Sequence, residues 1–96
     1  MALEASQKVP DGKMVGIELE TDSGKVKQAR IRGDFFLEPP EKLEKLESRI
    51  KGLETDTGKE KIIEGLESVE VDMIGFSSED VAEAFQKAVK GGENDE

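Results

Sequence analysis

Carboxylates are the most abundant side chains that could do chemistry in this chain, which contains 23 Asp and Glu residues but no His and no Cys. Without His or Cys, neither a Ser/His nor a Cys/His nucleophilic triad can be built, and the commonest transition-metal ligands are missing. No phosphate-binding loop of the GxxxxGK[ST] or GxGxxG type is present. Asp11-Gly12-Lys13 is the nearest approach, with too few Gly and Lys residues.

Paired carboxylates could support hydrolysis by acid–base chemistry. Most of the acidic residues, however, stand beside Lys or Arg on the polar faces of predicted amphipathic helices. We therefore interpret them as solvated surface charge. The sequence predicts no catalytic residue, no metal ligand and no cofactor bound by this chain alone, and an independent carboxylate-based hydrolase is poorly supported.

The strongest candidate for binding is the segment Gly33, Asp34, Phe35 and Phe36. Successive side chains of an extended strand face opposite ways, so two adjacent Phe residues cannot enter the same core. One of them is expected to pack inside, and the other to cover a second surface or contact a partner. Gly33 can supply a strand-end conformation closed to other residues, and Asp34 can cap a turn or contact a partner. We predict that these four residues form part of a partner interface or its immediate support, with core packing as the alternative.

Length and charge narrow the class of protein. Ninety-six residues correspond to one domain. The net charge of −9 would repel both a phosphate backbone and an anionic membrane, so neither nucleic acid nor a membrane is an expected partner. The sequence also lacks the apolar run of about 20 residues that a membrane helix needs, and its N-terminus lacks a signal-peptide profile. These features predict a soluble cytoplasmic domain.

Alternating apolar residues indicate a β-hairpin. Residues 13–20 and 25–32 read as its two strands, and Gly24 provides the positive φ of the turn between them. Along the second strand the apolar residues change from one set of alternate positions to the other, which predicts a bulge near Lys27 or Gln28.

The remaining segments predict helices and one more strand. An amphipathic helix is expected over residues 40–51, a shorter one over 57–66 with a Thr57/Glu60 capping box, a strand over 69–73, and a last helix capped by Ser77 with Asp80. The order β-β-α-α-β-α describes a small two-layer α+β domain, with helices covering one face of an antiparallel sheet. We place this domain at residues 9–90, between a flexible tail (1–8) and an acidic disordered tail (91–96).

Several stretches, in order, resemble a known family. They are Lys8–Val15, Asp22–Val26, Ile31–Phe36, Leu43–Leu53, and Ile74-Gly75 before a Ser-Ser-Glu-Asp helix start; the Gly-Asp-Phe-Phe ending the third is the most specific. From about Lys8 to Val89 the chain is thereby similar to the C-terminal accessory domain of lipoate–protein ligases. That resemblance implies a fold similar to small iron–sulfur scaffold proteins, although the absence of Cys argues against their function.

The resemblance also implies a partner and a role. In the family, a large catalytic domain binds ATP, Mg and lipoate, forms lipoyl-adenylate and transfers the lipoyl group to a Lys of an acceptor protein. A separate small chain resembles the two-chain type of this enzyme, a heterodimer in which the accessory subunit is needed for the adenylation step. The family's catalytic Lys and phosphate-binding residues have no counterpart here, so none is carried over. The alternative is a stand-alone acidic interaction or regulatory module of an unrelated pathway.

Overall fold

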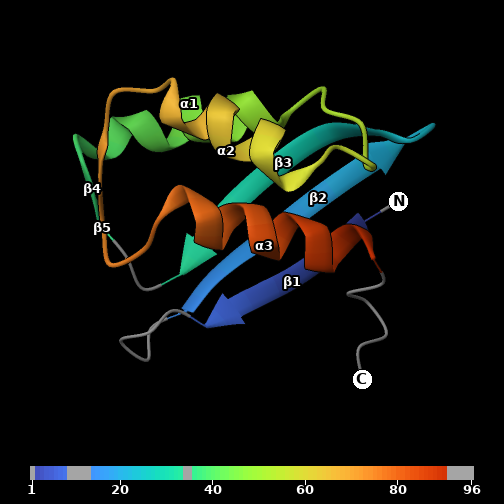
Figure 1. The fold of residues 1–96 in the computed structure, drawn as a ribbon, viewed down its shortest axis with the longest axis horizontal. Helices are drawn as coiled ribbons and strands as arrows, with labels where there is room; N and C mark the ends of the chain where they lie inside the picture. The colour runs from blue at the N-terminus through green and yellow to red at the C-terminus, as the bar shows by residue number, and fades with distance from the viewer. Residues whose placement is uncertain (1, 9–13, 34–35, 91–96) are drawn as a thin grey trace.

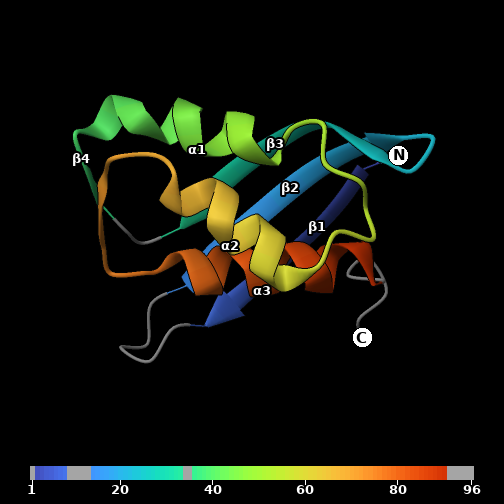
Figure 2. The ribbon, with the colours of Figure 1, turned by 45° about the horizontal axis from the view of Figure 1, so that its top comes forward.

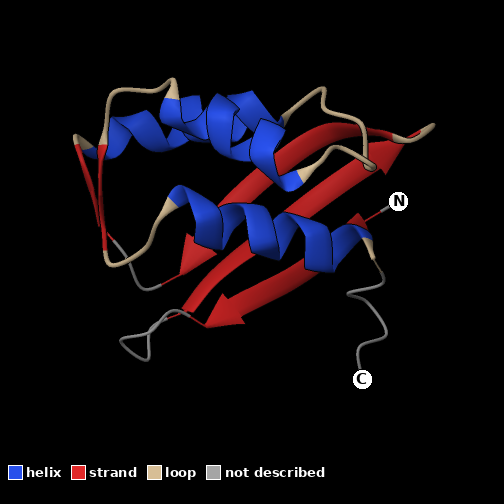
Figure 3. Cartoon of the chain, viewed as in Figure 1, coloured by secondary structure: helices blue, strands red, loops and turns tan. Residues whose placement is uncertain are grey.

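The computed structural model describes residues 2–8, 14–33 and 36–90. Its elements in chain order are β1 (Ala2–Lys8), β2 (Met14–Asp22), β3 (Lys25–Gly33), β4 (Phe36–Glu38), the 3₁₀ turn η1 (Pro40–Lys42), α1 (Leu43–Ile50), α2 (Lys59–Glu67), β5 (Asp72–Ile74) and α3 (Ser78–Val89). The strands pair antiparallel, and the helices lie together on one face of the larger sheet (Figures 1 and 3). The predicted α+β class with two layers is therefore confirmed.

The predicted hairpin forms the centre and one edge of a sheet with the order β1-β2-β3. Its turn is held by Ser23 and Gly24, with φ of 56° and 80°. The predicted bulge is also confirmed, because Glu20 faces Gln28 while Thr21 faces Val26, which leaves Lys27 as the extra residue. Because of the bulge, Val26 and Ile31 lie on the same buried face, although an odd number of positions separates them in the sequence.

The prediction of a flexible tail over residues 1–8 is wrong for the part that the structure describes. Ala2–Lys8 is a strand that pairs with β2 along its whole length, from Ala2 opposite Glu20 to Lys8 opposite Met14. Its inward side chains, Leu3 and Ala5, pack against the core. The predicted turn at residues 9–12 and the acidic tail at 91–96 lie outside the described residues.

A second, two-stranded sheet is formed by β4 and β5, which we call the ribbon. The sequence predicted β5 but not β4, so the observed order is β-β-β-β-α-α-β-α. The third predicted strand also begins later than expected, at Asp72, and it pairs with β4 rather than with the hairpin. Val69, expected inside that strand, is buried just beyond the end of α2.

The three described helices cover the inner face of the β1-β2-β3 sheet. α3 packs on β1 and β2, α1 packs on β3, and α2 lies between these two helices (Figure 2). The apolar faces of two predicted helices lie in the core: Leu46 and Ile50 of α1, and Val81 and Phe85 of α3, are at most 1% exposed. Such full burial of large apolar side chains is the main stabilising contribution to a small domain.

The two predicted helix caps differ in outcome. At α3, Ser77 accepts a hydrogen bond from the Asp80 backbone while the Asp80 carboxylate accepts one from the Ser77 backbone, which completes a capping box. At α2 the prediction of a Thr57/Glu60 box is wrong. The N-cap residue is Gly58, and the Thr57 hydroxyl instead donates to the backbone oxygen of Glu54 at 2.5 Å.

Candidate functional site

The predicted interface segment lies where the main sheet passes into the ribbon. Gly33 ends β3 and Phe36 begins β4, whereas Asp34 and Phe35 lie outside the described residues. Gly33 has φ of +141°, and a Cβ there would overlap the carbonyl oxygen of Met14 and lie 2.9 Å from Cα of Val15. The expected role of Gly33 at the strand end is therefore confirmed, because a side chain would collide with the neighbouring strand.

Phe36 is the surface member of this segment. It is 70% exposed, whereas the next residue, Leu37, is 6% exposed and belongs to the core. This alternation follows from the two-residue period of a strand. Burial of Leu37 on the inner side of β4 thus forces Phe36 outward.

Phe36 does not stand alone on the surface. Its direct cross-strand neighbour is Ile74 of β5, which is 47% exposed. Together with Pro40 and Leu43 these side chains border a surface hollow of about 420 Å³. We call Phe36, Pro40, Leu43 and Ile74 the ribbon patch. Sequence analysis missed Ile74, because only the pairing of β4 with β5 reveals that it lies opposite Phe36.

The ribbon patch has an acidic border. Glu38 and Asp72 form the other outward cross-strand pair of the ribbon, and Glu38 also lines the hollow. Like charges directly opposite each other in a sheet destabilise it. A partner that covers Phe36 and Ile74 with apolar side chains and brings a Lys or Arg to Glu38 and Asp72 would relieve that repulsion. The patch thus fits an apolar protein surface with a basic border.

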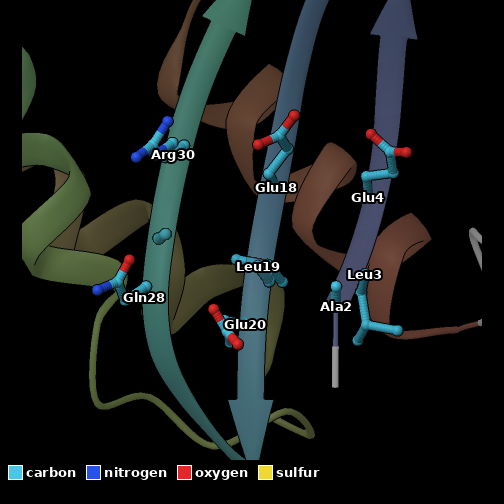
Figure 4. Close-up of a pocket in the computed structure, with 9 residues that line it drawn as sticks. Ala2, Leu3, Glu4, Glu18, Leu19, Glu20, Gln28 and Arg30 are labelled. Atoms are coloured by element: carbon cyan, nitrogen blue, oxygen red, sulfur yellow. The ribbon is translucent and has the colours of Figure 1, made fainter.

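The outer face of the main sheet is a second candidate surface, since the helices all lie on the opposite face. Here a hollow of about 420 Å³ is lined mainly by β1, β2 and β3. Glu4, Glu18 and Arg30 form one row across the strands (Figure 4), and Glu18 also accepts a hydrogen bond from Arg32 at 2.7 Å. The hollow is lined by both charged and apolar side chains, so it differs from an apolar pocket for a small ligand.

A cluster of charged residues links three elements. Lys59 at the start of α2 donates to Glu83 of α3 at 2.8 Å and lies 3.6 Å from Glu79, while Gln7 of β1 donates to the other oxygen of Glu83 at 2.9 Å. The hydrogen bond from Lys59 lowers the pKa of Glu83, and the bond to Glu83 raises the pKa of Lys59. All groups in this cluster are satisfied within the fold, so it joins elements rather than forming a reactive site.

The acidic residues of this chain are its candidate metal ligands. Over residues 2–8, 14–33 and 36–90, no group of three or more acidic residues is placed to hold a metal ion. No helix within these ranges is long and apolar enough to cross a membrane.

Comparisons with known proteins agree with each other. The model of the family described as the bacterial lipoate protein ligase C-terminus matches residues 1–87. Among solved structures, this chain is similar to a chain from the structural analysis of an archaeal lipoylation system. That work describes a bi-partite lipoate protein ligase and its E2 lipoyl domain from Thermoplasma acidophilum. The TM-score is 0.74 at 25% identity, covering 88% of this chain and 94% of that one. None of the curated proteins matches.

Proposed function

The chain belongs to the family of the bacterial lipoate protein ligase C-terminus, and from this premise we propose that it is the non-catalytic accessory subunit of a two-chain lipoate–protein ligase. Its partner in this proposal is the catalytic large subunit, which holds ATP, Mg and lipoate and forms lipoyl-adenylate. The lipoyl-acceptor domain is a partner only indirectly, through that subunit.

One observation carries the two-chain arrangement. The similarity to a chain from the study of a bi-partite lipoate protein ligase and its E2 lipoyl domain extends over 94% of that chain and 88% of this one. That study concerns a bi-partite ligase, which supports a catalytic subunit as the partner of this chain. The lack of His and Cys fits a subunit that leaves the chemistry to its partner.

The ribbon patch is the surface that we assign to this partner. An aromatic residue that is 70% exposed and paired with an exposed Ile is the kind of side chain that anchors protein interfaces. Gly33, three residues before Phe36, ends β3 in a conformation that a side chain would strain. We include Asp34 and Phe35 in the proposed interface because they lie between Gly33 and Phe36 in the sequence.

A subunit without reactive groups can promote adenylation by changing the population of its partner's conformations. If the accessory chain binds the adenylation-competent conformation more tightly than the alternative, it shifts the catalytic subunit toward that conformation. If the accessory chain raises the affinity of the catalytic subunit for lipoate and ATP by some factor, these ligands must raise the affinity between the two chains by the same factor.

Lipoyl-adenylate formation by the catalytic subunit, measured with and without this chain, tests the proposal. We expect strong dependence on the chain for adenylate formation and weaker dependence for lipoyl transfer from preformed lipoyl-adenylate. Equal adenylation in its absence would reject the accessory role and favour an interaction module of another pathway. Equal association of the chains with and without lipoate and ATP would reject the conformational coupling alone.

A further inference from the structure

The free edge of the main sheet is β1. Lys87 of α3 donates to the backbone oxygen of Ser6 at 3.1 Å, so this carbonyl points away from β2. In an antiparallel strand the N–H and C=O of one residue point the same way, and alternate residues repeat the direction. The backbone groups of Glu4 and Lys8 therefore point outward with those of Ser6. Within the described ranges no backbone hydrogen bond from another segment reaches this edge.

The opposite edge of the main sheet, β3, is hydrogen-bonded to other segments of the chain. Along β3, Val26 donates to Leu53 and accepts from Gly52, both at 2.8 Å. Further along the same strand, the N–H of Ile31 donates to the Glu47 carboxylate at 2.8 Å. β3 is thereby covered by the loop after α1 and by a side chain of α1. Among the residues that the structure describes, the only hydrogen bond to the outer edge of β1 comes from the exposed Lys87. Uncovered edges of this kind accept another strand.

The charges along β1 identify the strand that fits. If a second β1 runs antiparallel with Ser6 opposite its own copy, Glu4 lies opposite Lys8 of the other chain, and the reverse pair forms by symmetry. These are the residues whose backbone groups point outward, so each pair can exchange two backbone hydrogen bonds. Both side chains of each pair lie on the outer face, where an opposite-charge pair stabilises a sheet.

We propose that the free edge of β1 is a self-association site, at which two copies of this chain join their β1 strands antiparallel about Ser6 with Glu4 of each copy opposite Lys8 of the other. The joined sheet has two-fold symmetry, the commonest symmetry of soluble oligomers. This inference is independent of the proposed function. The site lies on β1, whereas the ribbon patch lies on β4, η1, α1 and β5, so the two surfaces share no element.

An unfavourable contact within one chain supports a second copy of the chain as the partner at this edge. Glu4 faces Glu18 in a non-hydrogen-bonded pair, the type whose Cα atoms approach to about 4.5 Å, and Figure 4 shows their side chains as neighbours. Glu18 has Arg32 as a partner, but Glu4 has no ion-pair partner among the described residues. Lys8 of a second copy supplies the missing cation. Lys87 does not prevent pairing, because a carbonyl oxygen has two lone pairs and its bond to Ser6 is exposed.

Exchanging the charges of Glu4 and Lys8 tests the site. The dissociation constant of the dimer is measured by sedimentation velocity over a range of concentrations. We expect reversible dimers, and we expect Glu4→Lys or Lys8→Glu alone to weaken them about tenfold or more, because both symmetric pairs become repulsive. The double variant E4K/K8E should restore the wild-type affinity. Within one chain these residues lie about 13 Å apart along the strand, so restoration reports a contact between chains.

A second pair of variants tests the backbone bonds. Ser6→Pro removes an N–H that points outward and leaves the ladder to β2 intact, so it should abolish the dimer while the far-UV circular dichroism is unchanged. Ser6→Ala, which keeps the N–H, should dimerise normally. A chain that is monomeric up to about 1 mM overturns the proposal, as does a dimer that either charge reversal leaves unchanged or the double variant fails to restore. Charge reversals that weaken only binding to the catalytic subunit would overturn it too and assign the edge to that subunit.

Discussion

Truncating Phe36 to Ala should weaken association with the catalytic subunit without unfolding the chain. A Phe side chain contributes roughly 200 Å² of surface on full burial, and 70% of Phe36 is exposed, so an interface could cover about 140 Å² of it. At about 25 cal/mol per Å² this corresponds to about 3.5 kcal/mol. Because the Ala Cβ keeps part of the contact, we expect a loss of about 2 kcal/mol, or a roughly 30-fold higher Kd.

Isothermal titration calorimetry of the two subunits measures this change, and urea unfolding of the isolated chain supplies the stability. The free energy of unfolding should change by no more than about 0.5 kcal/mol, as for most surface substitutions. Ile63→Ala is the matched control, since it shortens a half-buried aliphatic side chain on α2, outside the ribbon patch. A Kd for Phe36→Ala equal to that of the control would refute the assignment of the patch to this partner.

Three further predictions concern the fold. Gly33→Ala should lower the free energy of unfolding by about 1–3 kcal/mol in urea titrations, because φ of +141° and the overlap with Met14 strain any side chain there; wild-type stability would contradict it. Ser77→Ala should cost about 1 kcal/mol in the same measurement by removing the α3 cap, whereas Thr57→Ala, which caps no helix, should cost less. The Lys59–Glu83 pair should give pH dependence in both directions: the lowered pKa of Glu83 adds stability that is lost as pH falls through that pKa, and the raised pKa of Lys59 adds stability that is lost as pH rises through it. In Lys59→Met, the free energy of unfolding measured across the pH range should fall less at both low and high pH than in the wild type. A pH profile equal to that of the wild type would contradict this prediction.

Elements with strong local signals could be predicted from the sequence. The hairpin, its bulge at Lys27, the buried stripes of α1 and α3 and the Ser77 cap all depend on residues close together in the chain. β1 could not be predicted in the same way. Its inward positions carry only Leu3, Ala5 and Gln7, which is too little apolar surface to indicate a strand. It becomes a strand because β2 offers a hydrogen-bonding edge and α3 packs above it.

The candidate site was predicted in part for a related reason. Phe36 could be singled out because adjacent Phe residues conflict in a strand, and its exposure agrees with the surface alternative. Its neighbour Ile74 could not, because β4 has three residues and pairs with a strand far along the chain. Contacts between distant short strands depend on the tertiary fold more than on local propensity.

The bond from the backbone of Ile31 to the carboxylate of Glu47 has a consequence for how copies of this chain can assemble. Strand-to-strand growth into fibres needs two open edges on every molecule, one to receive a neighbour and one to offer the next. Here Glu47, with the loop after α1, occupies the second edge. In the proposed dimer, assembly through β1 therefore stops at a pair, because Glu47 and the loop after α1 cover part of the other edge of the main sheet.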